Sequence, residues 1–263
     1  RGQVDAQVRT ELYTVTKNNG TRRTGILFKQ EDSNLAPTIY LEEFYQKYLK
    51  GQQVPDLADS ICSIYQEIRV KKTCDCQNLF DFNHVKEHIV YKLIRRDANE
   101  ELLKQIPYEP FLDLAVVYYI QIDNTRFGSA TIQIRNEHLR YWRVEKEEIR
   151  RLAEKNTPRI YPVQIRQIVR FMYVATNEQC SLGAAVMRYP DFRKKVRGMI
   201  RGDFYILPSS IHEVILVPES FGLEPERMQE MVKEINQTGV APEEVLSDSV
   251  YYFDGEEIRI VAK

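Results

Sequence analysis

The chain has 263 residues, enough for one large domain or two modest ones that bury a core without disulfides or metals. Its apolar share of 43% and charged share of 29% exclude wholesale disorder, and its 37 basic and 38 acidic side chains exclude a global field that favours nucleic acid or an anionic membrane. The longest apolar run, residues 114–120, is far shorter than the roughly 18 residues of a membrane-spanning helix.

The beginning of the chain predicts a hairpin followed by two helices. Residues 11–16 and 25–29 have the pattern of short strands, and the Lys-Asn-Asn-Gly segment at 17–20 accepts the positive φ of a tight turn. Apolar residues recur at helical spacing over residues 41–49, and a proline begins a second helix over residues 55–68.

The middle of the chain predicts a long helix and a second hairpin. Residues 79–95 carry a stripe of apolar side chains at helical spacing. Residues 111–122 are almost continuously apolar, which is typical of a strand covered on both faces, and a turn leads into a partner strand at residues 129–134. A further helix is expected over residues 145–154.

The remaining segments alternate between short strands and helices. We expect strands at 171–176, 203–207 and 211–217, helices at 182–188, 191–200 and 225–238, and a final hairpin of 249–253 with 257–261.

Hairpins interspersed with helices favour an α+β fold with mostly antiparallel sheets. Pro158 and Pro162 lie close together, and prolines interrupt regular structure. We therefore place a boundary here and expect two lobes, residues 1–157 and 158–263.

The sharpest motif is His84-x-x-Glu87-His88, the H-x-x-E-H order of inverted zinc proteases. On a helix the two histidines share one face and could bind one zinc ion, with Glu87 as general base. On the expected helix, however, both point away from the apolar stripe, towards solvent and close to Arg95. An exposed polar face therefore competes with the protease hypothesis.

Two cysteines precede these histidines. Cys74 and Cys76 would complete a set of four soft ligands for a structural zinc with His84 and His88. The C-x-C spacing is tighter than the usual C-x₂₋₄-C, so reduced surface thiols in a cytosol are the simpler interpretation.

Ser210, His212 and Glu213 suggest a serine hydrolase. On a strand, His212 and Glu213 would point to opposite faces, and Ser210 would lie about 7 Å from His212, too far for direct proton transfer. We therefore interpret them as polar positions of a largely buried strand, among which Glu213 most needs a partner.

Phosphate-binding glycine loops are absent, because neither G-x-x-x-x-G-K-[ST] nor G-x-G-x-x-G occurs. Residues 193–201 form a basic run, which is interpreted as a solvated helix face rather than a nucleic-acid site.

Several stretches together resemble one family of uncharacterised bacterial proteins, known only as a domain of unknown function. They are residues 17–20, 37–41, 90–94, 111–116, 156–159, 205–218 and 240–248. The resemblance spans nearly the whole chain and implies a bacterial cytoplasmic protein. It implies no activity, cofactor or catalytic residue.

The preferred hypothesis is a non-enzymatic binding or interaction protein with a protein partner, because no catalytic constellation is supported and the chain has 16 tyrosines. The rival is a metal-dependent hydrolase that uses His84, Glu87 and His88, with zinc as its cofactor. Nucleic-acid binding through residues 193–201 is a third hypothesis. The question of enzyme or non-enzyme stays open at this point.

Overall fold

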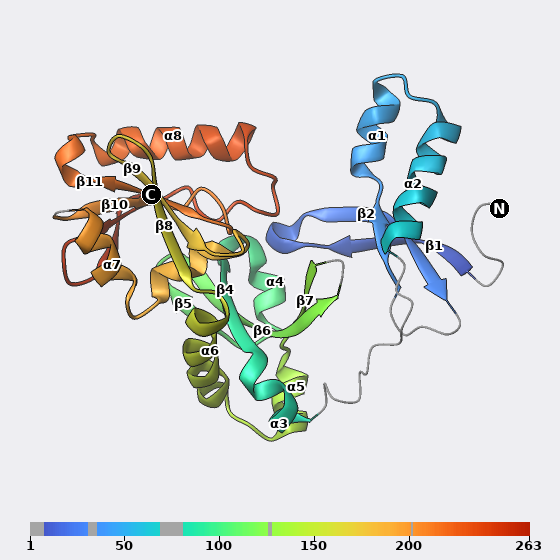
Figure 1. Ribbon diagram of the computed structural model, residues 1–263, viewed down its shortest axis with the longest axis horizontal. Coiled ribbons are helices and arrows are strands. Elements are labelled where there is room, and N and C mark those ends of the chain that lie inside the picture. Colours follow the sequence, from blue (N-terminus) through green and yellow to red (C-terminus); the bar gives the residue numbers. More distant parts are fainter. Residues whose placement is uncertain (1–7, 31–35, 69–80, 126–127, 201) are drawn as a thin grey trace. The chain divides into compact units, whose positions relative to one another are not determined.

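The computed structural model describes residues 8–30, 36–68, 81–125, 128–200 and 202–263. The chain divides into two compact units, Arg1–Leu79 and Phe80–Lys263. Both combine helices with antiparallel sheets, which confirms the expected α+β class (Figure 1).

The first unit is a three-stranded sheet in the order β1-β2-β3, with two helices on one face (Figure 1). The turn between β1 and β2 holds Asn19 and Gly20 at positive φ, as the sequence predicts. The helices begin where expected, and α2 buries Leu57, Ile61 and Tyr65 at a spacing of four residues. The elements are β1 (Val8–Thr16), β2 (Arg22–Gln30), β3 (Thr38–Tyr40), α1 (Glu42–Leu49) and α2 (Val54–Ile68).

The first sheet of the second unit is built around one long buried strand, β6 (Leu114–Thr125). Strand β4 (Ile89–Arg95) pairs along one side of it, and β5 (Tyr108–Phe111) and β7 (Gly128–Gln133) pair along the other. Residues 114–120 of β6 are buried on both faces, as expected, but the strand begins at Leu114 rather than at residue 111, which lies in β5.

The predicted helix over residues 79–95 is wrong. The Asp81 carboxylate accepts a hydrogen bond from the Asn83 backbone N–H and begins the short helix α3 (Phe82–Val85), which a 3-10 turn, η3 (Lys86–His88), extends. Strand β4 then follows directly. Its β-branched and aromatic side chains alternate between two buried faces of the sheet, and pairing with β6 stabilises the extended conformation.

Helix α6 (Lys146–Ile160) runs through Thr157 and Pro158. A proline so close to the helix end removes only one hydrogen bond of the last turn, so the helix does not break there. The predicted boundary at residue 157 therefore lies inside a helix of the second unit, where it separates that unit's two sheets. The other short helices of this part are η4 (Asp97–Asn99), α4 (Glu100–Leu103) and α5 (Asn136–Trp142).

The second sheet of this unit has six strands in the order β13-β12-β10-β11-β9-β8. Helix α8 packs on one face (Figure 1), where Met228 and Val232 belong to the same buried cluster as Leu207 and Val217. Strand β11 begins only at Val214, so the expected strand over residues 211–217 starts too early. The strands are β8 (Val163–Val169), β9 (Met172–Asn177), β10 (Phe204–Leu207), β11 (Val214–Pro218), β12 (Val250–Phe253) and β13 (Ile258–Ala262).

The helical segments around this sheet are η5 (Gly183–Arg188), α7 (Phe192–Met199), η6 (Glu219–Phe221) and α8 (Pro225–Thr238). Within the described ranges, no helix combines the length and the apolar character needed to cross a membrane.

Candidate binding site

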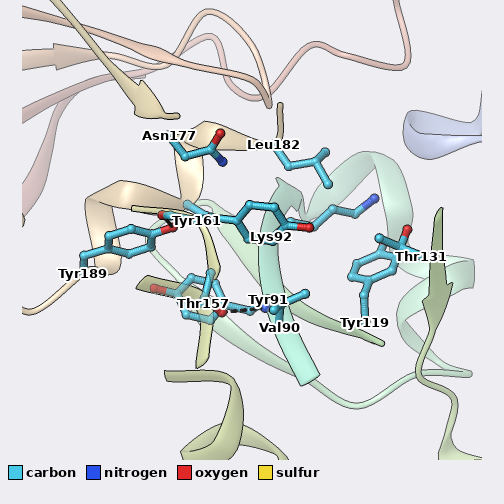
Figure 2. Close-up of a pocket in the computed structure, with 11 residues that line it drawn as sticks. Val90, Tyr91, Lys92, Tyr119, Thr131, Thr157, Tyr161, Asn177, Leu182 and Tyr189 are labelled. Atoms are coloured by element: carbon cyan, nitrogen blue, oxygen red, sulfur yellow. Dashed lines mark hydrogen bonds between the residues drawn. The ribbon is translucent and has the colours of Figure 1, made fainter. Parts of the chain in front are cut away.

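A hollow lies within the second unit, where the outer edge of β4 faces the segment that connects β9 to η5 (Figure 2). Its empty volume is about 310 Å³ when the part open to solvent is included. The enclosed part has room for about one water molecule. A group larger than one water molecule would therefore lie mostly in the open part of the hollow. The lining residues are Val90, Tyr91, Lys92, Tyr119, Thr131, Thr157, Tyr161, Asn177, Leu182, Ala185 and Tyr189.

The β4 side of the hollow is fixed by side chains from the end of α6. The Tyr91 backbone N–H donates to Thr157 Oγ1 at 3.0 Å, and the Thr157 hydroxyl donates to the Ala153 carbonyl at 2.6 Å (Figure 2). The Asn156 amide donates to the Ile89 carbonyl at 3.1 Å. Side chains of α6 thus form hydrogen bonds with backbone groups of β4 that a neighbouring strand would otherwise bond.

Two tyrosines near β4 form hydrogen bonds within the protein, and Tyr91 of β4 forms a ring contact with one of them. The Tyr161 hydroxyl donates to Gln121 Oε1, and the Tyr189 hydroxyl donates to the Tyr161 carbonyl at 2.9 Å. The rings of Tyr91 and Tyr189 meet edge to face, with 6.3 Å between their centroids. Burial raises the pKa of both hydroxyls, so they remain neutral phenols at physiological pH.

Tyr119 differs from Tyr161 and Tyr189. Its side chain is only 8% exposed, yet its hydroxyl forms no hydrogen bond with any described residue. Burial raises the pKa of this phenol, which therefore keeps its proton and can donate. The Lys92 Nζ lies 4.2 Å from the centroid of the Tyr119 ring. A hydrogen-bond donor and a positive charge thus lie close together in the hollow.

The opposite side of the hollow is formed by a strained loop, residues 177–183. Cys180 and Leu182 both have positive φ, at 51° and 55°, which is unfavourable for residues with a Cβ atom. The Asn177 side chain holds the loop: its Oδ1 accepts from the N–H groups of Gln179 at 3.1 Å and Ser181 at 3.3 Å. Strain of this kind is concentrated at functional sites.

His212 holds the same loop from the other side. Its Nδ1 accepts from the Leu182 backbone N–H at 3.2 Å, and its carbonyl accepts from the Thr176 hydroxyl at 2.8 Å. Gly183 fits closely beside it, because a Cβ at this position would lie 2.1 Å from Thr176 Oγ1 and 2.4 Å from the His212 carbonyl oxygen.

The three polar residues of the expected serine-hydrolase segment are therefore arranged differently from a catalytic set. Ser210 Oγ accepts the backbone N–H of His212 at 3.1 Å, and the imidazole Nδ1 is bonded to Leu182. The His212 Nε2 lies 3.4 Å from Glu244 Oε1, so Glu244 rather than Glu213 is the acid beside it. Residues 211 and 212 form a bend, and the strand geometry assumed from the sequence is wrong here.

The histidines of the zinc motif lie on α3 and η3, before β4. His84 is exposed and His88 half-buried, and the Glu87 carbonyl accepts from Arg159 at 2.8 Å. Cys74 and Cys76 lie outside the described residues. Within the described ranges, no group of three or more histidine, cysteine or acidic side chains is placed to hold a metal ion. Zinc binding stays a prediction, which native mass spectrometry of protein purified without added metal would test.

The basic run corresponds largely to α7, and part of it contacts the hairpin of β12 and β13. Arg193 donates to the Glu256 carbonyl, and its guanidinium lies 5.9 Å from the Phe253 ring centroid. Lys194 and Lys195 remain exposed.

Sequence reasoning did not find Lys92, Tyr119, Tyr161 or Tyr189 as site residues. The high tyrosine count was the only available signal, and it did not separate core tyrosines from binding tyrosines.

Together, these observations define an α+β protein with a small hollow between the two antiparallel sheets of its second unit. The chain belongs to the family of unknown function DUF5688, which matches it over residues 1–172 and 169–255. No curated protein and no solved structure matches the chain.

Proposed function

We propose that this is a non-enzymatic binding protein whose hollow takes a single carboxylate-bearing group. The observation that carries the proposal is the Tyr119 hydroxyl, which lines the hollow, is protonated and has no hydrogen-bond partner in the described part of the chain. A charged ligand acceptor would give this hydroxyl a hydrogen bond that contributes about 1.5–3 kcal/mol.

The chemistry around Tyr119 favours an anionic acceptor. Lys92 supplies a positive charge over the Tyr119 ring, and a hydrogen bond to a charged acceptor is stronger than one to a neutral acceptor. The apolar side chains of Val90, Leu182 and Ala185 suit a short aliphatic stem. A group the size of a glutamate side chain meets both requirements.

Isothermal titration calorimetry with N-acetylglutamate amide tests the proposal, with N-acetylglutamine amide as the neutral comparison. We expect saturable binding of the acid and about tenfold weaker binding of the neutral compound. Tyr119→Phe and Lys92→Met should each weaken binding of the acid by about tenfold, because each removes one polar contact.

Matched control variants lie outside the hollow in the same unit. Tyr108→Phe removes a half-buried tyrosine hydroxyl, and Lys104→Met removes an exposed ammonium. Neither should alter binding of the acid. Equal binding of the acid and the neutral compound, or equal loss in the control variants, would contradict the proposal.

A further inference from the structure

A second surface of the same unit has the character of an interaction site. We call it the β8 edge; it consists of β8 and the turn residues Arg170 and Phe171. Strand β8 is the last strand of its sheet, and in the described part of the chain it pairs only with β9. Ile168 is 47% exposed and Val169 56% exposed. An edge strand with exposed apolar side chains is open to pairing with another strand.

Phe171 is held in an unfavourable backbone conformation at the end of this edge. Its φ is 65°, in the left-handed region that a bulky side chain rarely adopts. Glycine or asparagine would meet the requirement of the turn with less strain. The ring is nevertheless 37% exposed, beside the Phe221 ring at 5.8 Å. An exposed aromatic residue in a strained position is better explained by contact with a partner than by stability of the fold.

The charge of the β8 edge specifies the chemistry of its partner. Arg166 and Arg170 are both exposed, and no acidic residue occurs from Pro162 to Asn177. In the described ranges, neither arginine has a carboxylate within ion-pair distance. The Arg170 guanidinium lies over the Phe171 ring, 4.8 Å from its centroid. The surface is therefore basic and apolar, which complements a segment that is acidic and apolar.

A second copy of this chain does not meet that requirement. An antiparallel pair of two β8 strands in full overlap would place Arg166 directly opposite Arg166. Like charges directly opposite each other destabilise a strand pair.

The geometry points to docking of an extended acidic segment of a partner protein along the β8 edge, as an added strand. Backbone hydrogen bonds would come from residues 163–167, because a bulge between Gln167 and Val169 ends the regular ladder. The apolar side chains of the segment would contact Val169 and Phe171, and its acidic side chains would pair with Arg166 and Arg170.

Fluorescence anisotropy with a labelled peptide tests this docking in the full chain. The probe alternates valine or isoleucine with glutamate over eight residues, and a comparison peptide carries lysine in place of glutamate. We expect saturable binding of the acidic peptide only. A version with proline in the centre should not bind, because it cannot complete the added strand.

Two variants locate the binding. The double variant Arg166→Glu with Arg170→Glu should weaken binding of the acidic peptide by at least about tenfold, and so should Phe171→Gly. Lys194→Glu, which reverses one exposed charge on α7, should leave binding unchanged. Circular dichroism of each variant confirms that the fold is retained.

Four outcomes would overturn the inference. They are equal binding of the two peptides, binding that survives the Arg166 and Arg170 double variant, association of the protein with anionic phosphatidylglycerol vesicles but not with the peptide, and a stable dimer in sedimentation equilibrium that excludes the peptide. Because these variants leave Tyr119 and Lys92 intact, failure here is distinguishable from failure of the hollow as a ligand site.

Discussion

Tyr119 contributes its ring to the apolar core beside Val90, Val117 and Ile94, and its hydroxyl to the hollow. The ring contacts would be present whether or not a ligand binds. The hydroxyl is not needed for packing of the core, because a phenylalanine ring would fill the same space. The two properties can therefore be separated by one substitution.

Tyr119→Phe should change the free energy of unfolding by no more than about 1 kcal/mol, because the hydroxyl that it removes forms no hydrogen bond with the described residues. Urea denaturation followed by circular dichroism measures this change. A loss of stability larger than about 1 kcal/mol would mean that the hydroxyl is already bonded in the free protein.

Phe171 gives a second prediction at the residue scale. Phe171→Gly should raise the free energy of unfolding by up to about 1 kcal/mol, because glycine adopts a φ of 65° without strain. Phe171→Ala loses the same contact with Phe221 but retains a Cβ atom at positive φ, so it should be the less stable of the two. Thermal unfolding of both variants decides the order, and an equally stable alanine variant would show that the backbone is not strained.

His138 should make the free energy of unfolding depend on pH. At the start of α5, its Nδ1 accepts a hydrogen bond from the Arg135 backbone N–H at 2.9 Å. Burial, and to a smaller extent the charge of Arg135, lowers the pKa of His138 below the usual value of 6.5. The folded protein therefore binds this proton less readily than the unfolded chain. The contribution to stability is present above about pH 6.5 and is lost as the pH falls through the lowered pKa. Urea midpoints at about pH 8 and pH 5 should differ more in the wild type than in His138→Gln, and equal differences would contradict this assignment.

At the scale of elements, the sequence predicts segments whose local pattern agrees with their final environment. The hairpin of β1 and β2 and the helix α8 follow from turn residues and from one apolar stripe. Strand β4 was missed because Val85, Ile89 and Leu93 recur at helical spacing while Ile89, Tyr91 and Leu93 alternate as on a strand. Pairing with the distant strand β6, from Ile89 with Ile120 to Arg95 with Leu114, decides between the two.

Strand β8 was missed for the opposite reason. It is an exposed edge, so it has no continuous apolar run and no clean alternation. The hollow could not be predicted either, because its residues come from segments that only the packed sheets bring together. The sequence singled out Glu213 rather than His212 as the residue that most needs a partner, and the bond of His212 to Leu182 depends on a loop thirty residues earlier in the chain.

Gly183 connects the loop to the sheet and gives a prediction for this element. Gly183→Ala should lower the free energy of unfolding by about 1–3 kcal/mol, because the added methyl group overlaps Thr176 Oγ1 and the His212 carbonyl. Gly198→Ala on α7 is the matched control: nothing lies within 4 Å of its Cβ, so helix propensity should raise stability by about 0.5–1 kcal/mol. Urea denaturation measures both, and similar effects at the two positions would contradict the close fit at Gly183.

At the scale of the whole molecule, the chain forms two compact units, and both the hollow and the β8 edge belong to the second. Both sheets of that unit are complete within residues 80–263. We expect a fragment of these residues to fold alone and to bind N-acetylglutamate amide as the full chain does. Circular dichroism and calorimetry test this, and an unfolded fragment would show that the first unit is required for the second to fold.

The most direct test of the central claim is nuclear magnetic resonance of protein labelled with ¹³Cζ-tyrosine, titrated with N-acetylglutamate amide. Tyr119→Phe identifies the signal of the ring in question. We predict a saturable shift of the Tyr119 signal, little change for tyrosines remote from the hollow such as Tyr252, and loss of the effect in Lys92→Met. A Tyr119 signal that does not move while the ligand binds, or no binding at all, would contradict the assignment of the hollow as the ligand site.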